Sequence, residues 1–148
     1  MALYHGRRIV TGHDAQGRSI VISDEAPKNV VPNPADPDRG HINFWRTENV
    51  PANNAMFADP MDGPPCALAP PKGGTMFRFV PFGRNRRMGQ MFEAAGAAHV
   101  RVDTERHPSM HKTDSVDYIV LLKGEVTALL DVGEVQMKSF DVLIQRVT

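Results

Sequence analysis

This 148-residue chain lacks three things: paired cysteines, long apolar runs and a net charge. Its single cysteine, Cys66, excludes an intrachain disulfide and favours a reducing, cytoplasmic location. No stretch approaches the ~20 apolar residues of a membrane helix, and we expect no secretory leader. Lys+Arg and Asp+Glu both total 17, so net charge gives no reason to expect nucleic acid or a membrane as a partner.

Proline is plentiful but unevenly placed. Ten of the 12 prolines fall between Pro27 and Pro71. Such density argues against central strands and long helices, so we expect ordered loop wrapped over a core. One exception is the segment His41–Thr47, where apolar and polar residues alternate as in a strand.

Short β-rich runs lie on both sides of this Pro-rich region. Arg8–Thr11 and Ser19–Ile22 flank a turn-forming stretch and predict an N-terminal hairpin. Further strands are expected at Thr75–Val80, Val100–Val102, Val116–Leu122, Val126–Leu130, Glu134–Met137 and Val142–Gln145, with a short helix or irregular segment at Met88–Ala98. Short strands separated by turn signals indicate an all-β sandwich or barrel.

One face of the strand near residue 117 combines polar and apolar side chains. Residues two apart in an extended strand point the same way. The shared face therefore holds, in order, His111, Thr113, Ser115, Asp117, Ile119 and Leu121. Polar side chains gather at one end and apolar ones at the other, which suits a barrel interior with a wet mouth, a usual place for small-molecule sites.

The spacing of His111, Thr113, Asp117 and Gly124 resembles the first motif of the cupins, which reads His, any residue, His, three residues, Glu, six residues, Gly. The stretch Gly133–Thr148 resembles the start of their second motif. The resemblance implies a cupin double-stranded β-helix, a jelly-roll-like barrel. Residues 75–148 would form its core, and residues 1–74 a hairpin and Pro-rich wrap within one structural domain.

Cupins hold a divalent metal between imidazoles and a carboxylate, so the resemblance implies Fe, Mn, Ni or Zn bound by His111 and Asp117, with His107 on the same face as a third ligand. The sequence departs from the motifs in three places. Thr113 replaces the second His, Ser139-Phe140 replaces a Pro-Gly turn, and Val147 replaces a Gly. The chain also stops at Thr148, before the second-motif His, so these residues do not supply the standard three-His, one-carboxylate set.

Two functions remain open. The first is a metal-assisted lyase or decarboxylase-like enzyme acting on an organic acid or polyketide-like compound, with His111 as ligand or proton shuttle and Asp117 as ligand or base. The second is a non-catalytic cupin that binds a small molecule or serves as a structural subunit, with His111 merely hydrogen-bonded and Asp117 paired to a cation. We treat Cys66 and the other histidines, His5, His13, His41 and His99, as structural. A homodimer is expected, with strand exchange as one route to it.

Overall fold

The computed structural model describes residues 6–33, 36–55, 58–82, 102, 105–108 and 110–147. These residues form strands, turns and loops without any helix, so the fold class is all-β as the sequence predicted. The part of the chain that is described has no helix long and apolar enough to span a bilayer. The predicted helix or irregular segment at Met88–Ala98, and most of the predicted strand at Val100–Val102, lie outside these residues.

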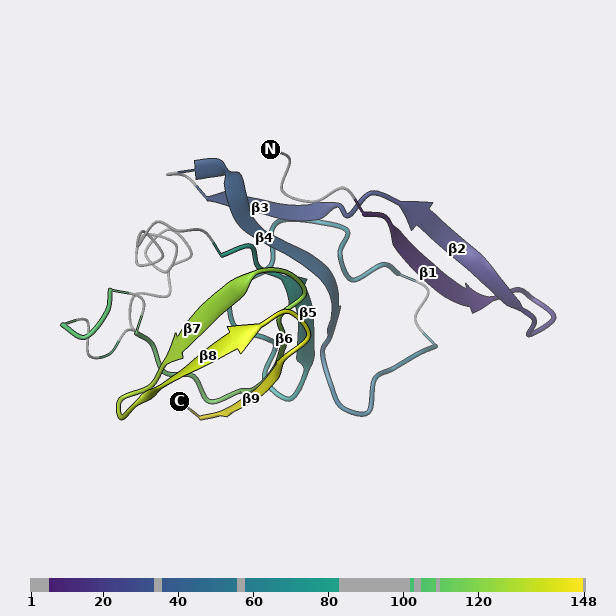
Figure 1. Ribbon diagram of the computed structural model, residues 1–148. Coiled ribbons are helices and arrows are strands. Elements are labelled where there is room, and N and C mark those ends of the chain that lie inside the picture. Colours follow the sequence, from purple (N-terminus) through teal and green to yellow (C-terminus); the bar gives the residue numbers. More distant parts are fainter. Residues whose placement is uncertain are drawn as a thin grey trace. The chain divides into compact units, whose positions relative to one another are not determined.

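The chain divides into two compact units, Met1–Arg84 and Asn85–Thr148. The strands, in chain order, are β1 (Arg8–His13), β2 (Ser19–Glu25), β3 (Asn29–Asn33), β4 (Asp36–Thr47), β5 (Thr75–Phe79), β6 (Val116–Val120), β7 (Glu125–Leu129), β8 (Glu134–Lys138) and β9 (Val142–Arg146) (Figure 1). Eight of these nine strands overlap predicted ones, and the strand predicted at His41–Thr47 extends back to Asp36 as β4.

The first unit contains a hairpin and a three-stranded antiparallel sheet. The hairpin pairs β1 with β2, and the sheet has the order β3-β4-β5. The strand β3 was not expected, because it contains Pro32 within the Pro-rich region. It lies at the edge of its sheet, where a missing N–H donor is tolerated, and this is why the proline does not prevent pairing.

The second unit contains two antiparallel pairs, β6 with β9 and β7 with β8 (Figure 1). Glycines make its reversals possible. Gly124 and Gly133 have φ angles of 92° and 82°, a left-handed conformation that side chains disfavour. Each described unit has its own buried apolar residues, Ile42 and Met61 in the first and Met110 and Met137 in the second.

Candidate functional site

The predicted face of β6 and the residues before it is present in the structure. From His111 to Leu121 every odd-numbered residue is half-buried, while every even-numbered one from 112 to 122 is exposed. Tyr118, for example, is 78% exposed and does not pack between sheets. The alternation is what a strand with one covered face produces.

Polar side chains on that face form a hydrogen-bonded row. The Ser115 hydroxyl lies 2.7 Å from Asp117 Oδ1 and 3.0 Å from Thr113 Oγ1. A hydroxyl has one hydrogen to donate, so when Ser115 donates to the Asp117 carboxylate, Thr113 can donate to Ser115. Asp117 itself is held opposite Gln145 in the β6–β9 pair. The row therefore orients a half-buried carboxylate, the group a general base requires.

The predicted metal ligands are not gathered into one centre. Among the described residues, which include His107, His111 and Asp117, no three His, Cys, Asp or Glu side chains lie close enough to share a metal ion. The backbone carbonyl of His107 accepts a hydrogen bond from the Met110 amide at 3.0 Å, as in a turn. The described residues therefore offer no three-ligand set, and no step proposed below depends on a metal.

The two turns that correspond to the motif glycines are tied together. The Gly124 amide donates to Ser139 Oγ at 3.1 Å, and the Phe140 amide donates to the Leu121 carbonyl at 2.6 Å. Phe140 has a φ of 75° and Val147 a φ of 46°. These are the two positions where the cupin motif has glycine and this chain does not. The backbone thus holds at both positions the left-handed conformation that glycine adopts readily and a β-branched or bulky residue does not.

A second polar cluster, which the sequence analysis missed, lies on the β3–β4–β5 sheet of the first unit. His41 and Asn43 are 2% and 0% exposed. Asn43 is paired with Asn29 on β3 and with Arg78 on β5. Burial, and secondarily the nearby Arg78 guanidinium, lowers the pKa of His41 to about 4, so its imidazole is neutral at neutral pH.

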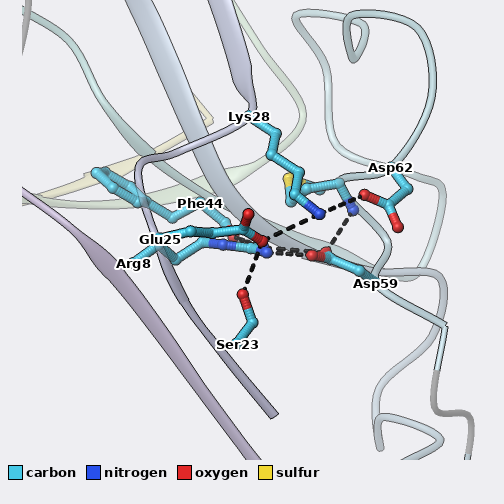
Figure 2. Close-up of polar contacts among 8 residues, drawn as sticks. Arg8, Ser23, Glu25, Lys28, Phe44, Asp59 and Asp62 are labelled. Carbon is cyan, nitrogen blue, oxygen red and sulfur yellow. Dashed lines mark hydrogen bonds and ion pairs between the residues drawn. The ribbon is translucent and has the colours of Figure 1, made fainter.

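An ion-pair network fastens the start of the hairpin to the loop after β4 (Figure 2). The Arg8 guanidinium binds both oxygens of Asp59 and donates to the Phe44 carbonyl at 3.2 Å. Lys28 Nζ lies 3.0 Å from both Glu25 and Asp62. The hydrogen bond from Arg8 holds the pKa of Asp59 below its usual value. Because each charge is paired, we read this network as structural.

Comparison with known proteins gives a sequence similarity without a reaction. No model of a known protein family matches the sequence. Two curated relatives from Diaporthe leptostromiformis are "Phomopsin biosynthesis cluster protein D" and "Phomopsin biosynthesis cluster protein C'". Each is 31% identical to this chain over 150 residues, which cover 95% of this chain. The chain spans 66% of the length of each, just under two thirds.

The similarity to the phomopsin cluster proteins takes in both units, since it covers 95% of the chain. The names of these relatives place them in a biosynthesis cluster and state no chemistry. Two groups of side chains in this chain could take part in a reaction or in binding: the hydrogen-bonded row from Thr113 to Asp117, which lies on the face that the sequence predicted, and the cluster around His41, which the sequence did not predict. The available signal for the latter was the His41-Ile42-Asn43 alternation, which puts two polar side chains on one face.

Proposed function

We propose that this chain is a cupin-type protein that transforms a small molecule. The observation that carries the proposal is the left-handed backbone at Phe140 and Val147. Both departures from the motif glycines fall where the fold still requires a positive φ, which a chance resemblance in sequence would not explain. The Ser139–Gly124 hydrogen bond, which joins the two motif turns, supports the same assignment.

The reaction proposed is lyase- or decarboxylase-like, on an organic acid or polyketide-like compound, as one step of a biosynthetic pathway. Asp117, oriented by Ser115, accepts a proton from the substrate. In a decarboxylation, the bond to the carboxylate carbon breaks, CO2 leaves, and the carbon that keeps the electron pair takes a proton from His111. The relatives' membership of a biosynthesis cluster supports a biosynthetic role and leaves the substrate to experiment.

The test is a screen of organic acids for product formation, including CO2 release, with wild-type protein and three variants. Asp117→Asn should lower turnover at least 100-fold, because removing a general base typically costs about 10²–10⁴-fold. Ser115→Ala should lower it less, since the carboxylate remains. Asp114→Asn is the matched control, because Asp114 is exposed on the opposite face. Equal loss in Asp114→Asn and Asp117→Asn would contradict the assignment.

The metal implied by the cupin resemblance remains a separate prediction. Elemental analysis of untagged protein purified without chelator, beside His111→Ala, tests it directly. Near-stoichiometric Fe, Mn, Ni or Zn that disappears in the variant would support a metal at His111. Wild-type protein that takes up none of these metals would remove metal from the proposal and leave the acid–base roles of His111 and Asp117 to the turnover assay.

A non-catalytic binding protein is the second candidate. It is favoured by Thr113, which stands where the motif has a metal-binding histidine, and by the absence of a three-ligand cluster in the described residues. A compound that binds the wild-type chain and is recovered unchanged, with Asp117→Asn binding equally well, would establish this function instead of catalysis. A cytoplasmic location and a homodimeric state complete the proposal.

A further inference from the structure

One face of the β3–β4–β5 sheet carries buried polar side chains. Residues paired across antiparallel strands share a face, so Asn29, Asn43 and Arg78 lie on the same side. His41, two residues before Asn43 on β4, joins them. Diagonal cross-strand neighbours lie roughly 7–8 Å apart, a distance that an arginine side chain spans, and this brings the Arg78 guanidinium within reach of His41.

The oxygen of the Asn43 side chain accepts no hydrogen bond from the part of the chain that the structure describes. Its Nδ2 donates to Asn29 Oδ1 at 2.8 Å, and the same oxygen accepts from the Cys66 amide at 3.3 Å. Asn29 Nδ2 in turn donates to the Pro64 carbonyl at 3.3 Å. These contacts fix both amides, because flipping Asn43 would set its oxygen against the Asn29 oxygen. Asn43 Oδ1 is therefore a buried acceptor without a donor among the described residues.

His41 adds two more unmet groups. Both ring nitrogens are buried and have no hydrogen-bond partner in the described structure. A neutral imidazole offers one donor and one acceptor. A buried polar atom without a hydrogen-bond partner destabilises the fold, so three of them on one sheet face would be a large penalty unless something occupies the site.

We propose that His41, Asn43 and Arg78 form a binding site for a small hydroxylated carboxylate. Arg78 supplies the positive charge that attracts the carboxylate, and the His41 N–H donates to one of its oxygens. Hydroxyl groups of the same ligand donate to Asn43 Oδ1 and to the other His41 nitrogen. A plain carboxylate, which only accepts, would leave these two acceptors unmet. The site lies wholly within Met1–Arg84 and does not depend on a catalytic role for His111 or Asp117.

The experiment is a calorimetric titration of the whole chain with tartrate and with succinate, which is tartrate without its hydroxyls. We expect wild-type protein to bind tartrate at least 10-fold more tightly than succinate. His41→Phe and Arg78→Met should each weaken tartrate binding at least 10-fold. His13→Phe is the matched control, because His13 is exposed on β1, and it should bind as wild type does.

Buried water is the competing occupant, and thermal unfolding distinguishes it from a ligand. If the orphan atoms serve a ligand, His41→Phe should leave the melting temperature of the unliganded chain unchanged or raised, because an apolar ring removes unmet polar groups. If buried water forms hydrogen bonds with His41, the same variant would lower the melting temperature. The proposal is overturned if wild-type protein does not bind tartrate, if tartrate and succinate bind equally, or if His41→Phe binds normally. Where His41→Phe does not fold, the tartrate affinity of Arg78→Met decides.

Discussion

Phe140 and Val147 adopt backbone conformations that suit glycine better than their own side chains. Holding a residue other than glycine in the left-handed conformation costs about 1–2 kcal/mol. Replacing that residue with glycine removes this strain, but glycine's extra freedom in the unfolded chain offsets about half of the gain. Phe140→Gly should therefore raise the free energy of unfolding by about 0.5–1 kcal/mol. Little packing is lost, since Phe140 is 79% exposed. Urea denaturation measures the change.

The matched control for Phe140→Gly is Val132→Gly. Val132 is 90% exposed and is not among the non-glycine residues with positive φ. At this position glycine only adds freedom to the unfolded chain, so we expect the free energy of unfolding to fall by about 0.5–1 kcal/mol. If both substitutions destabilise the protein alike, Phe140 is not strained and the main support for the cupin assignment fails.

His41 should make the protein's stability depend on pH in a defined window. Its pKa is lowered to about 4 in the folded chain, from 6.5 when unperturbed. Between these values the unfolded chain binds more protons, so the free energy of unfolding falls as the pH drops from 6.5 toward 4. The full effect is at most about 3 kcal/mol. Urea denaturation between pH 7 and pH 4.5 should show this slope in wild-type protein and in His13→Phe. The slope should be absent in His41→Phe.

At the scale of elements, the Arg8–Asp59 pair holds the hairpin to the loop after β4. Arg8 and Asp59 side chains are 5% and 18% exposed, so removing either leaves a poorly solvated charge. Arg8→Met or Asp59→Asn should each lower the free energy of unfolding by about 3 kcal/mol, and the double variant by clearly less than their sum. Arg7→Met is the control, because the exposed Arg7–Asp24 pair should contribute less than about 1 kcal/mol.

The same pair predicts acid sensitivity below the His41 window. The lowered pKa of Asp59 means that its stabilising effect is complete above the unfolded value of about 4 and is lost as the pH falls through the lower folded value. Unfolding measurements between pH 4 and pH 2 should show a stability loss in wild-type protein that is smaller in Asp59→Asn. A loss of equal size in both proteins would mean that other carboxylates account for it.

Local patterns in the sequence predicted most strands but only half of the candidate site. Alternation located β4 and put Ser115 and Asp117 on one face, because the period of two is a property of the strand itself. The edge strand β3 was missed because Pro32 argues against a strand unless its place in the sheet is known. The His41 cluster was missed for a similar reason. It depends on pairing Asn29, Asn43 and Arg78 across three strands, and no local pattern specifies that register.

At the scale of the whole molecule, the β1–β2 hairpin is the feature that points to self-association. These strands pair only with each other in the described sheets. Ile20 pairs with Gly12 and the Ile22 side chain lies against Gly12, so the two isoleucines share one face of the hairpin, where they are 40% and 46% exposed. A lone two-stranded hairpin is marginally stable in water, so a covering surface is needed. With zero net charge the chain does not repel its own copies, and we propose a second copy as the partner.

The isoleucine face makes the dimer testable with a substitution and its neighbour. Ile22→Lys sets a charge beside Ile20 on this face and should weaken dimerisation at least 10-fold, because an unpaired lysine would be buried in the contact. Val21→Lys adds the same charge on the opposite face, where the side chain is 58% exposed, and should leave the dimer intact. Sedimentation velocity from about 1 to 100 µM, concentrations spanning a typical dimer equilibrium, resolves the two species. A wild-type chain that stays monomeric throughout contradicts the dimer. Equal dissociation in both variants would show that charge, and not the isoleucine face, controls association.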